Sequence, residues 1–422
     1  MIKKIIEDLF KLPRFLLGEG ADKTLEYIND IIPLEIHEIK SGTKLWDWVV
    51  PEEWIIRDGW VKCNGEKIID FNDHPFAVIN YSMPINRIVD RKELEDHLFI
   101  SKEMPGAYPY EYSFYERQWG FSIPEKKYQE LIKDKDCKFE VFIDSEFKPG
   151  KLKIGVHTIK GKTEKEILLF AHTDHPWQAN DNLSGVACLV DMAQRLKDAG
   201  FDHTIKLIFT AETIGSIAYV KTQDISKVDF VIAVDACGNE NTLLWQKAYD
   251  KYDRLNYCAH LAVTGQGVDH RKGEFRFTIG SDEYIFNDRT INIPGIMFSR
   301  YEYKEYHTSE DTPDKINEDK IKEVQDVILR TIEIYEKDFI PKRNFKGILF
   351  RSGHGLQTTH KLLNRDLDYL MNEMDGKKYL TQLIIEVGLS FEYTTDVLNK
   401  LEKDGLILRV NTSQKRKQKA SK

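Results

Sequence analysis

Apolar runs that end in polar, chemically active side chains recur along the central part of the chain. The first run, Ile167–Ala171, is uninterrupted, as expected for a strand buried on both faces. His172, Asp174 and His175 follow it directly, and an apolar-rich helical pattern then covers Val186–Leu196. A strand, a polar loop and a helix in this order predict an α/β unit whose loop lies at the carboxyl edge of a sheet.

The same pattern returns three times further along the chain. Lys206–Phe209 is followed by Glu212, Phe230–Val234 by Asp235, and Gly295–Phe298, after a polar stretch, by His307. Because the carboxyl ends of parallel strands meet at one edge of a sheet, we expect these side chains to converge. Each of them alone could simply cap a helix or a turn. Their recurrence favours a divalent metal site, since zinc binds imidazole nitrogens and carboxylate oxygens.

Changes in residue pattern and composition along the chain predict several domains. The fold class is α/β, with a mixed, mostly parallel sheet sandwiched by helices. The predicted division is an α/β domain from residues 1–45 and 146–341, an inserted β-rich domain at 46–145, a winged helix-turn-helix domain at 342–412, and a basic disordered tail at 413–422.

The predicted insert is rich in aromatic residues. Five of the seven tryptophans lie in it, and short β-like runs such as Phe76–Tyr81 are separated by Asn, Asp, Pro and Gly. Aromatic residues alternate over part of the stretch from Tyr108 to Phe121. This stretch is either one packing face of a sheet or a wall over the site, and the sequence leaves both interpretations open.

The C-terminal region shows helical patterns near Leu367–Met374, Leu380–Val387 and Tyr393–Lys403, and a strand-like run after Gly405. Three short helices and a hairpin resemble a winged helix, which could bind nucleic acid. However, much of the basic excess lies in the last residues, and the third helix mixes acidic with basic side chains. We therefore favour a protein-interaction or dimerisation role, and expect a homo-oligomer.

Composition limits the class of protein. The chain has 422 residues, a formal net charge of -8 and 41% hydrophobic residues, which is ordinary for a protein without membrane spans. Its five cysteines are scattered and odd in number, which predicts reduced thiols rather than disulfides. The N-terminal residues lack the apolar run of a signal peptide, so we expect a cytoplasmic location without membrane contact.

The motifs resemble those of the co-catalytic zinc aminopeptidase family, which includes leucyl aminopeptidase-like, glutamate carboxypeptidase-like and glutaminyl cyclase-like enzymes. The matches, in the family's order, are H-x-D at 172–174, D-[DN]-x-S-G at 181–185, F-x-A-E at 209–212, the strand-end Asp235, an approximate S-D-H at 281–283 and H-T-x-x-D-T at 307–312. The Trp-rich insert and the winged-helix tail are similar to a bacterial aminopeptidase-like group that is often associated with surface-polysaccharide loci.

The resemblance implies a role for each matching residue. One Zn²⁺ would be held by His172, Asp181 and Asp235, and Asp181 would bridge to a second metal completed by His307. Asp174 would orient the His172 ring, and Glu212 would be the general base. The substrate would be a small peptide or amide. Asp311 and Thr312 are expected only to cap the next helix.

Two residues depart from the family pattern. Thr213 stands where the family supplies a carboxylate ligand, and Glu283 follows Asp282 where the family has His. The site could therefore hold one metal, Glu212 could itself be a ligand, or His175 or Glu283 could fill the gap. Of these, His175 is expected to be structural or to support a ligand. An inactive descendant is a further possibility.

The sequence thus predicts a zinc-dependent hydrolase, most simply an aminopeptidase or amidohydrolase. The alternative from another class is a winged-helix regulator or scaffold whose degenerate peptidase domain senses a ligand, and an acyl-transfer reaction of the cyclase kind is a minor one. The helical H-E-x-x-H zinc motif and the G-x-S-x-G motif of serine hydrolases are both absent from the sequence.

Overall fold

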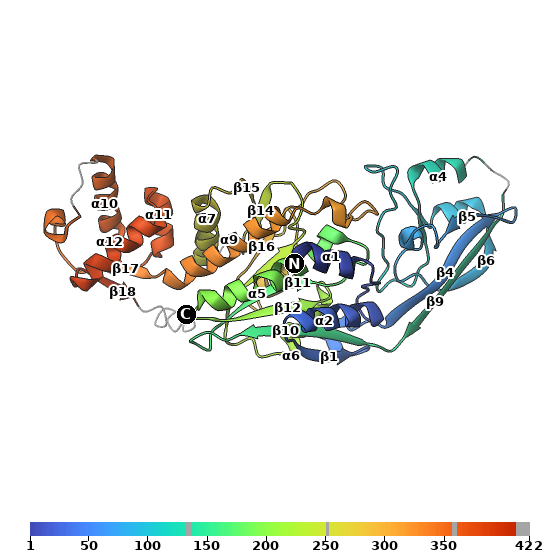
Figure 1. Cartoon of the computed structure of the whole chain (residues 1–422), viewed down its shortest axis with the longest axis horizontal. Coiled ribbons are helices and arrows are strands. Elements are labelled where there is room, and N and C mark those ends of the chain that lie inside the picture. Colours follow the sequence, from blue (N-terminus) through green and yellow to red (C-terminus); the bar gives the residue numbers. More distant parts are fainter. Residues whose placement is uncertain (132, 134–136, 250–252, 357–360, 411–422) are drawn as a thin grey trace. The chain divides into compact units, whose positions relative to one another are not determined.

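The structure, a computed structural model, describes residues 1–131, 133, 137–249, 253–356 and 361–410. Its largest feature is an eight-stranded mixed sheet (Figure 1). In spatial order the strands are β1 (Glu35–Lys40), β10 (Lys151–Ile159), β12 (Thr204–Thr210), β11 (Glu166–His172), β13 (Val228–Asp235), β16 (Gly295–Ser299), β14 (Leu243–Gln246) and β15 (His270–Gly273). The predicted mixed sheet is confirmed.

The four central strands, β12, β11, β13 and β16, run parallel, and antiparallel pairs flank them. Their register brings the strand ends together, because His172 lies opposite Thr210 and Asp235 lies opposite Ser299. The strands are almost entirely buried, which explains their continuous apolar runs. All four carboxyl ends therefore lie at one edge.

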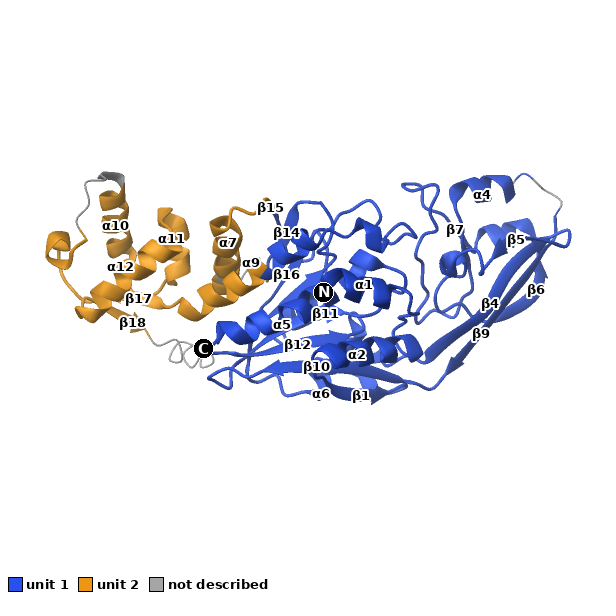
Figure 2. Ribbon diagram, in the orientation of Figure 1, with its two compact units in different colours: residues 1–247, 271–325 blue, residues 248–270, 326–422 orange. Residues whose placement is uncertain are grey.

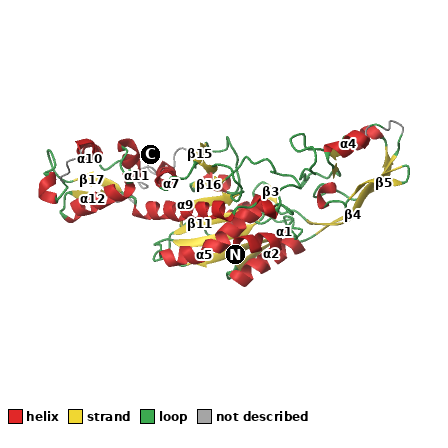
Figure 3. Cartoon of the chain, turned by 45° about the horizontal axis from the view of Figure 1, so that its top comes forward, coloured by secondary structure: helices red, strands yellow, loops and turns green. Residues whose placement is uncertain are grey.

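Helices flank this sheet, as Figure 3 shows. They are α1 (Ile2–Phe10), α2 (Glu19–Ile31), α5 (Gly185–Ala199), α6 (Ile214–Thr222) and α8 (Glu283–Asn287). Phe170 of β11 packs against Tyr219 of α6 and Phe286 of α8, with ring centroids 5.8 and 5.2 Å apart. Helix α5 lies along β11, β12 and β13, and α1 packs against α5. The helix α9 (Glu318–Lys337) follows later in the chain.

The aromatic-rich region forms its own four-stranded sheet, in the order β5 (Glu66–Asp70), β4 (Glu53–Cys63), β9 (Phe139–Lys148) and β6 (Ile85–Val89). Its smaller elements are β2 (Lys44–Leu45), β3 (Trp48–Val49), α3 (Arg91–Glu95), β7 (Leu98–Phe99), β8 (Phe121–Ser122) and α4 (Glu125–Leu131). Side chains such as Val61, Phe121 and Phe139 form a separate apolar core under this sheet.

The strand predicted at Phe76–Tyr81 was wrong. The segment holds a short 3-10 helix, Pro75–Ala77, and then bonds two different segments through single bridges, Val78 to Phe121 and Asn80 to Tyr112. Its apolar side chains are buried although the segment lies between these two neighbouring segments and is not a strand of a sheet.

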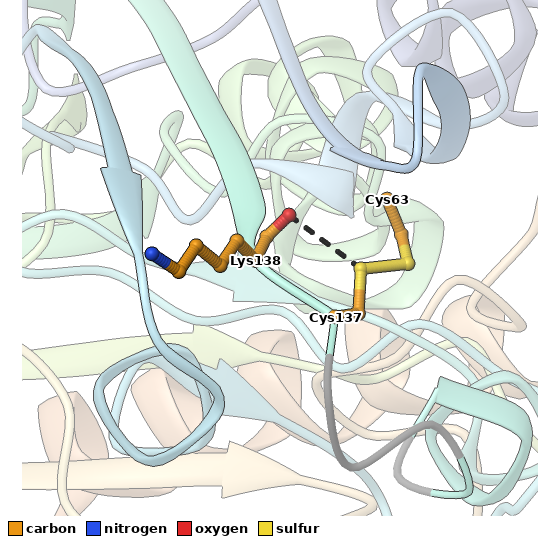
Figure 4. The surroundings of a disulfide bond; sticks show 3 residues. All are labelled: Cys63, Cys137 and Lys138. Atoms are coloured by element: carbon orange, nitrogen blue, oxygen red, sulfur yellow. Dashed lines mark hydrogen bonds between the residues drawn. A yellow bond between two sulfur atoms is a disulfide. The ribbon is translucent and has the colours of Figure 1, made fainter.

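The expectation of five reduced cysteines was also wrong. Cys63 and Cys137 form a disulfide (Figure 4). Cys188, Cys237 and Cys258 are buried free thiols. Cys63 is the last residue of β4 and pairs in register with Phe139, so Cys137 lies beside it. The two residues are 74 positions apart, and no local spacing reveals the pairing.

The chain divides into two compact units (Figure 2): residues 1–247 with 271–325, and residues 248–270 with 326–422. The second unit contains α7 (Asp253–Gly265), β17 (Ile340–Arg343), α10 (Lys361–Glu373), α11 (Leu380–Val387), α12 (Phe391–Lys403) and β18 (Ile407–Val410). Helices form at the three predicted places, but β18 pairs with β17, which precedes them, rather than within a hairpin that follows them. The predicted domain limits and the winged-helix type stay predictions, and the predicted tail, 413–422, lies outside the described residues.

Among the residues that the structure describes, no helix has the length and apolar character needed to cross a bilayer.

Candidate metal centre

The carboxyl edge of the parallel strands collects the predicted site residues. His172 ends β11, Asp235 ends β13, and Glu212 follows β12. His307 lies in the loop after β16, and Asp181 lies in the turn Ala179–Ser184 that leads into α5. His172 and Asp181 come from the connection between β11 and α5, while Glu212, Asp235 and His307 each follow a different strand.

The D-N-x-S-G segment is bonded tightly to the end of β13. The Asn182 side chain donates to the Val234 carbonyl at 2.8 Å and accepts from the Ala236 and Gly185 amides at 3.1 and 3.0 Å. The Ser184 hydroxyl accepts from the Cys237 amide. A Cβ on Gly185 would lie 2.4 Å from the Val234 carbonyl oxygen, so no larger residue fits there. The motif therefore anchors the loop to the end of β13 and holds Asp181 beside the carboxyl ends of the strands.

Asp181 is the centre of the cluster. Its Oδ1 lies 3.2 Å from His172 Nε2 and 3.0 Å from His175 Nδ1, and its Oδ2 lies 3.0 Å from His307 Nε2. His172 Nε2 is also 3.5 Å from Asp235 Oδ1. Although burial opposes ionisation, the positive charge of His175 and the adjacent imidazoles hold the pKa of Asp181 well below its ordinary value.

Several of these atoms are buried without a hydrogen bond. They are His172 Nε2, Asp174 Oδ2, Asp181 Oδ2, Asp235 Oδ1 and His307 Nε2. Buried polar groups left unpaired are costly, and elsewhere in proteins such groups nearly always find partners. Here His307 Nε2 lies 3.0 Å from Asp181 Oδ2, and His172 Nε2 lies 3.5 Å from Asp235 Oδ1. Donor type, burial and convergence all fit a divalent cation such as zinc.

Asp174 contacts both His172 and Glu212. Its Oδ1 faces His172 Nδ1 at 3.1 Å and accepts from the Glu212 amide at 2.9 Å. The first contact leaves His172 Nε2 directed at the cluster. The Glu212 side chain is 25% exposed, and its Oε2 lies 3.9 Å from His175 Nε2. Burial raises the pKa of Glu212 above its ordinary value, while the charges of His172 and His175 act against this rise.

The residues that depart from the family pattern lie outside the cluster. The Thr213 amide donates to Asp282 Oδ1 at 3.0 Å. Glu283 is fully buried, and its two carboxylate oxygens accept from the Gln246 side chain and the Ser281 amide. In the described part of the chain, each potential metal-holding group of three or more His, Cys, Asp or Glu residues excludes Asp282 and Glu283.

His175 lies inside the cluster. It belongs to two of the three groups of potential ligands, one with His172 and Asp174 and one with Asp181 and His307. The sequence suggested only a supporting role for it, because Pro176 follows and no motif covers it. His175 lies in the cluster because a backbone turn directs its ring inward, and the sequence did not reveal this turn.

Arg14 is a site residue that the sequence did not reveal. This fully buried guanidinium donates to the carbonyls of Thr173, Asp174, His175 and Gln178 at 2.7 to 2.9 Å. Burial lowers the pKa of Arg14 to about 10, so it stays protonated at neutral pH. The loop that carries Asp174 and His175 is therefore shaped by a charge from the first 20 residues.

The expectation that Asp311 only caps the next helix was wrong. Its carboxylate accepts from the Asn180 and Asp181 amides at 2.8 and 3.1 Å and from the Tyr303 hydroxyl at 2.9 Å. Burial raises the pKa of Asp311 to about 7. The residue thus holds the backbone of Asn180 and Asp181. The Thr312 side chain gives no cap bond to the following turn.

Aromatic rings of the insert border the cluster. The Tyr110 ring lies 5.3 Å from the His175 ring and 5.2 Å from that of His307, and Tyr112 lies 6.3 Å from His307. Phe114 stacks on Tyr112 and lines a cavity of about 410 Å³ together with Val50, Tyr81 and Phe147. Trp119 and Phe121, in contrast, belong to the core of the insert. The alternating stretch therefore divides, with one part as a wall of the site and the other as packing.

A family model described as "Domain of unknown function (DUF4910)" matches residues 3–338. A protein from Clostridium acetobutylicum, described as "Putative polysaccharide biosynthesis protein with aminopeptidase-like domain", is 32% identical over 418 residues, 95% of each chain.

The chain is also similar to solved structures. A crystal structure described as a "putative peptidase" from Clostridium acetobutylicum superposes with a TM-score of 0.80 at 30% identity, covering 97% of this chain and 96% of that one. BSAP, a zinc aminopeptidase from Bacillus subtilis, superposes with a TM-score of 0.58 at 16% identity, covering 78% and 94%. The second likeness shows a shared fold, the one that the motif resemblance implied.

Proposed function

Since the chain belongs to the family described as "Domain of unknown function (DUF4910)", whose name assigns no reaction, we propose the function from the site: a metal-dependent hydrolase of the aminopeptidase-like type. The observation that carries the proposal is the set of buried, unpaired nitrogen and oxygen atoms that converge at the carboxyl edge of the sheet. Such a group is unfavourable in the folded protein unless a cation binds it.

We assign the ligands from these atoms. His172, Asp181 and Asp235 would hold a divalent metal, with zinc favoured by the mixed nitrogen and oxygen donors. Asp181 would share its second oxygen with His307. Asp174 would fix the tautomer of His172, because it bonds the ring nitrogen that faces away from the cluster.

Glu212 would be the general base. When bound, the metal acts as a Lewis acid, which polarises a carbonyl and lowers the pKa of a water molecule. The Glu212 carboxylate would take the proton from the attacking water and deliver it to the leaving amine. Its backbone amide is fixed by Asp174, so the side chain projects from a held position. Tyr110 and Tyr112 would limit the solvent around the reacting bond.

The substrate class rests on similarity. The related fold of a zinc aminopeptidase supports cleavage of an N-terminal peptide or amide bond. The C. acetobutylicum relative is described through both polysaccharide biosynthesis and an aminopeptidase-like domain, so an amino-acylated or amide-bearing precursor of a polysaccharide is a second substrate to test. The regulator alternative is not favoured, because a ligand sensor would not require unpaired metal donors. A protein-interaction or oligomerisation role for the C-terminal helices stays part of the proposal.

A panel of aminoacyl amides and dipeptides tests the proposal. Chelator-treated protein is assayed with and without added Zn²⁺, beside Glu212→Gln. We expect zinc-dependent amine release, and a loss of about 10²- to 10⁴-fold in kcat for Glu212→Gln with the metal content unchanged. Glu310→Gln, in a loop outside the cluster, is the matched control. Metal-free protein as active as the loaded protein, or full activity in Glu212→Gln, would overturn the assignment.

A further inference from the structure

The second half of the cluster lacks a ligand that the resemblance leads one to expect. Thr213 stands at the position of a carboxylate, and its backbone amide is bonded to Asp282. Glu283 cannot supply the missing group without breaking its bonds to Gln246 and to the Ser281 amide. With only Asp181 and His307, this half would offer two protein donors, fewer than the three that zinc usually takes at a reactive site.

His175 lies where a third donor is needed. One ligand atom from each of His175, Asp181 and His307 can be chosen so that all lie within 4.8 Å of one another. The ring centroids of His175 and His307 are 5.3 Å apart. Asp181 Oδ1 lies 3.0 Å from His175 Nδ1 and 3.2 Å from His172 Nε2, and Asp181 Oδ2 lies 3.0 Å from His307 Nε2. Because its two oxygens face His172 and His307 separately, the Asp181 carboxylate can contribute to two cation sites, with His175 beside it.

The backbone holds His175 in this place at a cost. His175 has a φ of +62° and Trp177 a φ of +54°, in the left-handed region that residues other than glycine rarely adopt. Such a conformation persists when the surroundings determine it. Here Arg14 donates to the carbonyls of His175 and Gln178, and the His175 side chain is 5% exposed. A ring that served only as packing would not require this turn.

We propose that His175 replaces the missing carboxylate and completes, with Asp181 and His307, a second divalent metal site. The proposal rests on the proposed metal-dependent function and deepens it, since it makes the centre binuclear. A neutral imidazole in place of a carboxylate leaves this half with one negative charge less, so its affinity for a cation is lower than that of the half with His172 and Asp235.

Metal titration tests this directly. Full-length protein is stripped with a chelator and titrated with Co²⁺, with absorption spectra and metal analysis as readouts that need no turnover. We expect two equivalents for the wild type, the second weaker than the first. In His175→Ala the second equivalent should bind more than about 100-fold more weakly, because even loss of an outer partner of a ligand costs 10- to 100-fold. The first equivalent should be retained.

Two further variants make the result specific. Glu283→Gln, which alters the other candidate, should keep both equivalents. His175→Glu should also keep both, since it restores a carboxylate donor, and it guards against loss of the fold in His175→Ala. Circular dichroism of the metal-free proteins checks that the loop change leaves the sheet intact.

The outcomes separate the two claims. One equivalent in the wild type would overturn the binuclear site, and two equivalents of unchanged affinity in His175→Ala would overturn the role of His175 as a ligand. Glu212-dependent hydrolysis would still stand in both cases. A wild type that binds no divalent metal and hydrolyses nothing would instead overturn the proposed function itself.

Discussion

The edge of the large sheet and the sheet of the insert are both built from strands, yet they treat polar groups in opposite ways. In the insert, apolar side chains such as Val61 and Phe139 fill the core, and charged pairs such as Arg57 with Asp144 stay exposed. At the edge, imidazoles and carboxylates are buried and several of their atoms are unpaired. The insert is arranged for stability, and the edge holds groups that a ligand must satisfy.

The two regions also differ in what holds their backbones. Ladder hydrogen bonds between β4 and β9 fix the insert, and a disulfide closes its end. The loop around Asp181 has no ladder, and side chains from distant segments hold it instead: Arg14, Asn182, Ser184 and Asp311. Substitutions in the apolar core of the insert should therefore change stability alone, and substitutions of the residues that hold the Asp181 loop should change metal binding as well.

The largest stability effect is expected in the insert. Phe139→Ala removes a ring that is 1% exposed and should lower the free energy of unfolding by about 3–5 kcal/mol. The metal stoichiometry should not change. Urea unfolding and metal analysis measure the two effects, with Ile88→Ala on the exposed face of the same sheet as control. A large loss of metal in Phe139→Ala would contradict the separation of the two regions.

A smaller stability effect with a clear effect on metal binding is expected for Arg14→Lys. An ammonium cannot span the four carbonyls that the guanidinium fork reaches, so we expect a loss of about 2–3 kcal/mol. The affinity for the first metal should fall by about 10- to 100-fold.

The matched control is Arg57→Lys in the insert, whose exposed ion pairs should contribute about 0–1 kcal/mol. If Arg14→Lys binds metal like the wild type, then the loop does not depend on this charge, and Arg14 has only a packing role.

The third effect depends on pH. Burial raises the pKa of Glu283 from 4.5 to about 7, so the folded state favours its neutral form. The stability that this gives is complete below about pH 4.5 and is lost as the pH rises through about 7. Glu283→Gln, which stays neutral, should nearly match the wild type at pH 4.5 and exceed it by about 3 kcal/mol at pH 8, in metal-free protein.

Urea unfolding at the two pH values measures this difference, and Glu7→Gln on the exposed side of α1 is the control. An equal difference between Glu283→Gln and the wild type at both pH values would show that Glu283 does not titrate as described.

Much of the fold could be read from the sequence because the central strands are buried on both faces and therefore apolar without interruption. The same runs located His172, Asp235 and Glu212, since each follows a strand end. The roles of these residues stay predictions, although the structure brings them together.

The rest depended on contacts that no local pattern encodes. Arg14 reaches carbonyls about 160 residues away, and backbone carbonyls leave no trace in the sequence. His175 required a left-handed turn before a proline to face the cluster. Cys63 and Cys137 meet through strand register, and Phe76–Tyr81 is apolar because it is covered on both sides rather than because it is a strand.

The central claim is that a divalent cation binds the buried donors at the carboxyl edge of the sheet. Anomalous scattering at the zinc edge, from crystals of the full chain grown with zinc, tests it most directly. The account predicts a strong peak about 2.0–2.2 Å from His172 Nε2, Asp181 and Asp235. Zinc-containing crystals without a peak among these residues would contradict it.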